Sequence, residues 1–192
     1  MAGHSDRAHA LLSASGAHRW LCCTPSALLE AQFPDTGSEA AKEGTLAHEL
    51  AEARLMNYFK PKVFTKRMLS TRITKLRKDP LWADEMIGCT ETYLDAVKEA
   101  ALGFDSTPYA AIEKKVDLSE WIPEGFGTAD CVMISGSVLH IFDYKHGKGV
   151  PVAAAHNPQM QLYALGAWKA FRILYDVKVV RMTIVQIGRA HV

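Results

Sequence analysis

The chain has 192 residues, of which 48% are hydrophobic and 22% are charged, with 22 Lys and Arg against 21 Asp and Glu. A folded chain of this length buries roughly 70% of its extended surface, so it can form a core without disulfides or a structural metal, which argues against global disorder. The formal charge of +1 excludes a polybasic, histone-like protein. Any nucleic-acid site must therefore be local.

The sequence also argues against export and membrane insertion. No apolar run approaches the ~18 residues of a membrane span, and the start MAGHSDRAHALLSASG lacks the basic-then-apolar order of a signal peptide. The cysteines are too few and too irregularly spaced for a secreted disulfide framework: Cys22, Cys23, Cys89 and Cys131. We therefore expect reduced thiols in a soluble, cytoplasmic protein with no membrane association.

The first half of the chain has helical character. Apolar residues follow helical spacing from Leu11 to about Tyr58, with a turn at residues 33–37, where Pro and Gly interrupt the pattern. Residues 60–78 hold eight Lys or Arg and no acidic residue, and a further helical stretch runs from about Leu81 to Leu102. The sequence thus predicts a helical N-terminal section, with three helices before the first strand.

After Pro108 the apolar pattern becomes β-like. Three short β-rich runs cover residues 109–116, 128–135 and 138–145. Only Gly136 and Ser137 separate the last two, which predicts a hairpin. Asn157-Pro158 supplies an N-cap and first-turn proline for a helix to about Leu174, and residues 177–187 form a fourth predicted strand. This order predicts a single α/β domain over residues 1–192.

The end of the chain has an unusual sequence. The last six residues, IGRAHV, match the translation of a common sequencing-library adapter. We therefore expect residues 187–192 to be a non-native tail and the natural protein to continue beyond Gln186.

The second hairpin strand carries a charged pair. Asp143 and Lys145 are two residues apart, so both side chains lie on one face of the sheet, and Asp130 comes from the adjacent strand. A buried carboxylate and ammonium are costly without a partner or metal. Two Asp side chains and the backbone carbonyl of Tyr144 are oxygen ligands suited to Mg²⁺ or Mn²⁺. Lys145 could then help to deprotonate an attacking water and offset charge in a phosphoryl transition state.

Two helical pairs could reach the same site. Gln159 and Tyr163 are i and i+4, so they lie on one face of the last helix. His48 and Glu52 are spaced in the same way, with Glu49 beside them. We expect His48 to be a metal ligand or a phosphate contact.

Four motifs occur in order: G-x-x-x-H at 44–48, GTAD at 127–130, DYK at 143–145 and Q-x-x-x-Y at 159–163. Together they resemble the RecB/AddB-type branch of the PD-(D/E)XK nucleases. SASGAHRWLCCTPS with EGTLAHELAE resembles, more closely, a phage and prophage group of these proteins that has no assigned function. The resemblance covers about residues 11–186. It implies a restriction-endonuclease-like mixed sheet flanked by helices.

The resemblance also implies roles for individual residues. Asp130 and Asp143 would bind a divalent metal, Lys145 would be catalytic, and His48 would be an accessory metal or substrate residue. Gln159 and Tyr163 would position the strand or the active site. Some relatives hold an iron-sulfur cluster through one N-terminal and three C-terminal cysteines. Cys23 resembles the first ligand, but this chain lacks the other three.

These features predict a metal-dependent DNA nuclease, more specifically an exonuclease, that hydrolyses phosphodiesters in phage recombination or DNA processing. Its expected partners are DNA and phage recombination proteins. Lys148, between two glycines, could contact a phosphate, although GKG lacks the spacing of a nucleotide-binding loop. The cations of residues 60–78 could contact phosphates or form a solvated face. The alternative function is a catalytically inactive nucleic-acid-binding or phage structural module that retains the nuclease fold.

Overall fold

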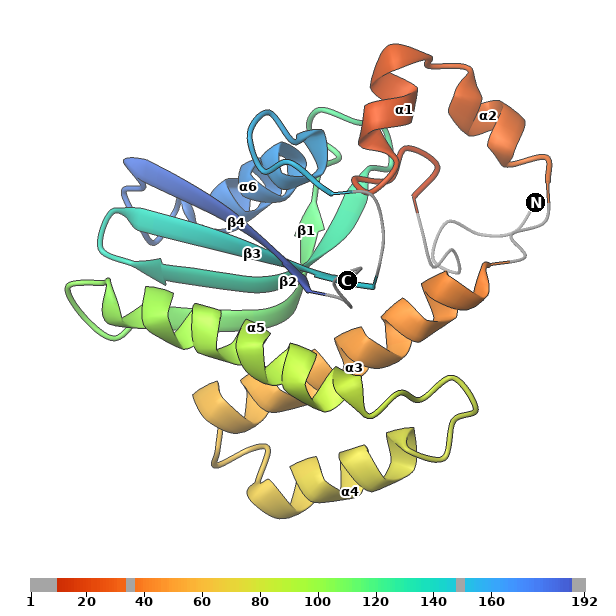
Figure 1. Cartoon of the computed structure of the whole chain (residues 1–192). Coiled ribbons are helices and arrows are strands. Elements are labelled where there is room, and N and C mark those ends of the chain that lie inside the picture. The colour runs from red at the N-terminus through yellow and green to blue at the C-terminus, as the bar shows by residue number, and fades with distance from the viewer. Residues whose placement is uncertain (1–9, 34–36, 148–150, 188–192) are drawn as a thin grey trace.

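The computed structural model describes residues 10–33, 37–147 and 151–187. The protein is an α/β protein with a four-strand mixed sheet between helices and a helical N-terminal part, as the sequence predicts (Figure 1). The helices and strands are, in chain order, α1 (Ala17–Cys22), α2 (Ser26–Glu30), α3 (Glu39–Phe59), α4 (Lys66–Leu76), α5 (Glu85–Leu102), β1 (Tyr109–Asp117), β2 (Phe126–Ser135), β3 (Val138–His146), α6 (Pro158–Phe171) and β4 (Val179–Ile187). No helix in these ranges is long and apolar enough to cross a membrane.

The N-terminal part differs from the prediction, because five helices rather than three precede β1 within the described ranges. One of them, α4, lies inside the cationic segment 60–78. It begins where the Thr65 side chain accepts a hydrogen bond from the Met68 amide, and Ile73 and Leu76 pack against the core. Apolar residues at helical spacing therefore form a helix even in this strongly basic run. The predicted turn at 33–37 lies partly outside the described residues.

The predicted hairpin and the predicted last helix are both confirmed. Gly136 has a φ of 55° in the tight turn between β2 and β3, a conformation that glycine adopts without strain. The Asn157 side chain accepts a hydrogen bond from the Met160 amide, and Pro158 is the first residue of α6. The tail predicted for 187–192 falls almost entirely outside the described residues, and Ile187 is the last residue of β4.

The sheet has the strand order β1-β2-β3-β4. The first three strands pair antiparallel, whereas β4 pairs parallel to β3. A parallel neighbour requires a crossover connection, and α6 provides it. In Figure 1, α6 lies on one face of the sheet, α3 and α5 cover the other face, and α4 packs on the far side of α3.

Each face of the sheet has its own hydrophobic core. Leu139 and Ile141 of β3 belong to the core under α6, whereas Phe142 and Tyr144 belong to the core under α3 and α5. We call these the α6-side core and the α3/α5-side core. Asp143 follows the alternation of Leu139 and Ile141, so the charged end of β3 lies on the side of α6.

The alternation of faces reverses within β1 and β2. In β1, Ile112 packs in the α3/α5-side core, yet Val116, which has the same parity, packs in the α6-side core. Glu113, which follows Ile112, has a φ of 48°, which is unusual for a residue other than glycine. In Figure 1, β1 and β2 curve toward α1 beyond this region.

The same reversal occurs in β2 at Asp130. Ala129 packs in the α6-side core and Cys131 packs in the α3/α5-side core. Pairing between β2 and β3 ends at Cys131 and Phe142, so the two strands are unpaired at Asp130. The sheet therefore bends and opens at one place, and side chains from both faces can meet there.

Gly166 allows α6 to pack closely on β1. A Cβ at this position would lie 2.8 Å from Val116 Cβ, whereas a Cβ at Gly88 in α5 would have no neighbour within 4 Å. Gly166→Ala should destabilise the protein, because overpacking costs ~1–3 kcal/mol, and Gly88→Ala should stabilise it by up to ~1 kcal/mol through helix propensity. Urea unfolding of both variants measures the difference, and a Gly166→Ala protein as stable as Gly88→Ala would contradict this packing.

Candidate active site

The Asp130 side chain connects β2, β3 and α3. Its Oδ2 accepts a hydrogen bond from the Tyr144 amide at 2.6 Å, and its Oδ1 lies 3.3 Å from His48 Nδ1. The carboxylate thus takes the place of a strand partner for β3 where pairing with β2 has ended. Because its side chain is only 12% exposed, these partners also offset the cost of removing the carboxylate from water.

Glu113 joins Asp130 and His48 in a cluster that could hold a cation. One ligand atom from each of the three residues lies within 4.8 Å of the other two. Although much of Glu113 is solvent-accessible, burial of its carboxyl and the nearby charge of Asp130 raise its pKa to about 7. Burial lowers the pKa of His48, but the hydrogen bond and charge of Asp130 outweigh it and raise that pKa. An imidazole and two carboxylates are donors that divalent metals accept.

Asp143 forms an adjoining group with Lys145 and Gln159. Lys145 Nζ lies 2.9 Å from Asp143 Oδ2 and 3.2 Å from Oδ1, and Gln159 Nε2 donates to Oδ1 at 3.1 Å. Asp143 is 2% exposed, and burial raises its pKa to about 6 although the Lys145 ammonium acts in the opposite direction. These contacts place a buried carboxylate and an oriented ammonium at the end of β3.

The α6 residues hold this group in place. Gln159 Oε1 accepts from Lys145 Nζ at 3.2 Å, and Gln159 Nε2 also lies 3.0 Å from the Tyr163 hydroxyl. Tyr163 packs against Gly127, where a Cβ would lie only 2.7 Å from the ring. The glycine of the GTAD motif therefore makes room for Tyr163, and burial raises the pKa of that tyrosine.

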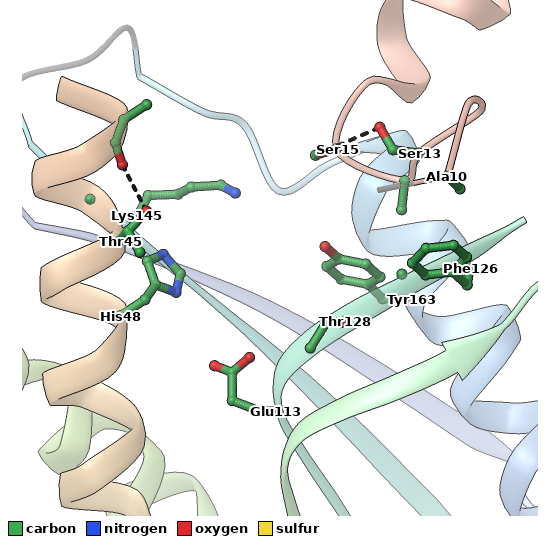
Figure 2. Close-up of a pocket in the computed structure, with 14 residues that line it drawn as sticks. Ala10, Ser13, Ser15, Thr45, His48, Glu113, Phe126, Thr128, Lys145 and Tyr163 are labelled. Carbon is green, nitrogen blue, oxygen red and sulfur yellow. Dashed lines mark hydrogen bonds between the residues drawn. The ribbon is translucent and has the colours of Figure 1, made fainter. Parts of the chain in front are cut away.

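Members of both groups line a pocket of about 630 Å³: His48 and Glu113 from the first, and Lys145 from the second. Figure 2 shows His48 and Lys145 on one side of it, Tyr163 and Phe126 on the other, and the Glu113 carboxylate between them. The segment before α1 and the start of α3 complete its wall. This volume is within the range of small-molecule sites and admits part of a polymer substrate.

The predicted residues are brought together in two neighbouring groups rather than one. Asp130 lies with His48, and Asp143 lies with Lys145 and Gln159, so the oxygens of the two Asp residues have different partners. Asp143 is not part of a cation-capable cluster in the described ranges. Its role as a ligand beside Asp130 therefore stays a prediction.

Three other predicted residues have less support from the geometry. The Tyr144 ring is buried, stacked on Tyr93 with centroids 4.9 Å apart, and the use of its carbonyl as a ligand stays a prediction. Cys23 is exposed after α1, and the described cation-capable clusters contain no cysteine. The role of Cys23 as an iron-sulfur ligand stays a prediction. Lys148 lies outside the described residues.

Glu113 is the site residue that the sequence did not reveal. Its position relative to Asp130 is set by the register between β1 and β2. The connection between these strands, from Asp117 to Phe126, is too long for the type of turn to determine that register. The cationic segment 60–78 contributes no residue to the pocket lining. Most of its Lys and Arg residues are exposed, as a solvated face requires, and a role in phosphate binding stays a prediction.

One protein-family model matches most of the chain. The family described as "Protein of unknown function (DUF2800)" matches residues 9–192. The chain belongs to the DUF2800 family. No solved structure matches it. Because the description of DUF2800 names no activity, a function must be argued from the site itself.

The raised pKa of Glu113 predicts a pH-dependent effect of Glu113→Gln. The folded protein holds this proton more tightly than an unfolded chain, where the pKa is 4.5, so the stability that Glu113 contributes should be lost as pH rises from 4.5 through about 7. In EDTA, the free energy of unfolding of Glu113→Gln should equal that of wild type below pH 4.5. It should exceed the wild-type value by the largest margin above pH 7.

Urea unfolding across this pH range measures the difference. Glu99→Gln on the exposed side of α5 controls for the loss of one negative charge. A difference between Glu113→Gln and wild type that does not change with pH would contradict the assigned environment of Glu113.

Proposed function

We propose that this DUF2800 protein is a metal-dependent DNA nuclease of the PD-(D/E)XK type, with an exonuclease as its specific form. The observation that carries the proposal is that His48, which contacts Asp130, and Lys145, which contacts Asp143, line the same pocket. These residues come from motifs that resemble RecB/AddB-type nucleases. They would act together on one scissile phosphodiester.

The order of elements supports a restriction-endonuclease-like fold. A helix carrying His48 precedes three antiparallel strands, and a crossover helix then leads to a strand parallel to the third. Asp130 and Asp143 lie on the two central strands, and Gln159 lies on the crossover helix. The four motifs thus lie on a helix, a hairpin and a following helix, as expected for such a nuclease.

The donor set fits a divalent metal. His48, Glu113 and Asp130 would hold the ion, and Asp143 would complete the set if its carboxylate exchanged Lys145 for the cation. A bound Mg²⁺ or Mn²⁺ would supply a Lewis acid beside the phosphate and lower the pKa of a coordinated water. His48 and Glu113 also have raised pKa values, so both groups would lose protons when a cation binds.

Lys145 has the geometry of an electrostatic catalyst. Asp143 and Gln159 fix its ammonium by three contacts at the edge of the pocket. A cation held in this way can stabilise the negative charge that grows on a phosphate during attack, with little reorganisation. Gln159 and its neighbour Tyr163 would act as positioning residues, because they contact Lys145 directly or through one hydrogen bond.

The proposal of DNA as substrate and of phage recombination proteins as partners rests on the sequence resemblance. The proposal of a cytoplasmic location rests on the few, irregularly spaced cysteines. The alternative is a nucleic-acid-binding or phage structural module without catalysis. Measurements of DNA binding and DNA cleavage distinguish these two functions, because only cleavage by a nuclease requires both the metal and Lys145.

A second Asp-x-Lys in the chain offers a matched control for the activity. Lys178 and Asp176 also form an ion pair at 2.9 Å, but they are exposed and lie outside the pocket. Lys145→Met should reduce cleavage at least ~100-fold, because it removes a cation that would stabilise the transition state. Asp143→Asn should have an effect of similar size, because it removes the carboxylate that holds Lys145 and would complete the metal site. Lys178→Met and Asp176→Asn should retain wild-type activity.

The assay uses end-labelled single- and double-stranded DNA with Mg²⁺, Mn²⁺ or EDTA. Metal-dependent cleavage that is lost only in the first pair of variants supports the nuclease. DNA binding in gel-shift assays that survives EDTA and both site substitutions, without any cleavage by wild type, would instead establish the non-catalytic module.

A further inference from the structure

A second group of metal-ligating side chains lies outside the candidate active site. It contains Glu43 near the start of α3, Glu85 at the first position of α5 and His146 at the end of β3. One ligand atom from each residue lies within 4.8 Å of the other two. None of the three lines the active-site pocket.

The orientation of His146 distinguishes this group from a chance cluster of acidic residues. Its side chain is only 1% exposed, and its Nε2 points to Glu43, with 3.6 Å between Nε2 and Oε1. Nε2 is buried and makes no hydrogen bond with any residue in the described ranges. A buried ring nitrogen without a hydrogen bond is costly, and a coordination bond would satisfy it.

The other ring nitrogen has the partner that a metal-binding histidine needs. His146 Nδ1 lies 3.1 Å from the Tyr144 hydroxyl. If the ring proton is on Nδ1 and is donated to this hydroxyl, the Nε2 lone pair is free and faces the carboxylates. In histidines that bind metals, a hydrogen bond from the other ring nitrogen fixes the tautomer and the orientation of the ring.

We propose that Glu43, Glu85 and His146 form a second metal site, which binds a divalent transition-metal ion of the Zn²⁺ class. Imidazole nitrogen with two carboxylates is a donor set that Zn²⁺ accepts in four-coordinate sites, with water in the remaining position. Mg²⁺ prefers oxygen ligands and retains its waters, so it should compete poorly here.

The ion would have a structural role. It would join α3, α5 and β3, which are far apart in the sequence and pack together in the α3/α5-side core. His146 directly follows Lys145, and Glu43 lies on the same helix as His48. The site would therefore fix the two elements that carry candidate active-site residues, whether or not the protein is a nuclease.

The experiment isolates this site by removing the first one. Full-length protein with His48→Gln and Glu113→Gln, which keeps the Asp130 contact with the Tyr144 amide, is stripped with EDTA, dialysed and titrated with Zn²⁺ against a chromophoric chelator. It should bind one equivalent of Zn²⁺, and the ion should raise its melting temperature. Adding His146→Gln should weaken this binding at least ~10-fold, as the loss of a metal-binding contact does.

Two further variants keep the test decisive. His140→Gln is the matched control, because His140 is also a buried histidine of β3 but bonds to Thr183 at 2.9 Å, away from both clusters; it should leave Zn²⁺ affinity unchanged. Glu43→Gln replaces a more exposed ligand and should weaken Zn²⁺ binding if His146→Gln fails to fold. No Zn²⁺ bound in the first background, or equal affinity in folded His146→Gln and Glu43→Gln proteins, would overturn the proposal.

Discussion

The arrangement of the site depends on the Asp130 carboxylate. It accepts a hydrogen bond from the Tyr144 amide where β2 and β3 have stopped pairing, and it contacts the imidazole of His48 on α3. A buried carboxylate requires such partners, and a strand amide without a neighbouring strand requires an acceptor. One side chain therefore satisfies both requirements, and it joins the sheet to the helix that covers it.

The opening at Asp130 explains how residues from both faces reach one pocket. In a regular sheet the α6-side and α3/α5-side residues would be separated by the strands themselves. Here the faces of β1 and β2 reverse at Glu113 and Asp130, so His48 from one face and Lys145 from the other line the same cavity. The unusual backbone of Glu113 is part of this bend, and strained residues of this kind often lie at functional sites.

Local rules predicted much of the fold and part of the site. The Gly136 turn, the Asn157 cap and the shared face of Asp143 and Lys145 follow from neighbouring residues alone. Glu113 could not be predicted in the same way, because its place opposite Asp130 depends on strand register across a long connection. The same limit applies to clusters such as that around His146, where three distant elements meet through tertiary packing. The high density of positive charge in segment 60–78 gave no indication of α4, the helix that lies within it.

If Asp130 organises a cation site at the bend of the sheet, crystals of the protein grown with Mn²⁺ should show the ion by anomalous diffraction. We expect a peak within ~2.0–2.3 Å of a carboxylate oxygen of Asp130 and of at least one ligand atom of His48 or Glu113. Well-ordered density for all three side chains with no anomalous peak among them, at saturating Mn²⁺, would contradict it.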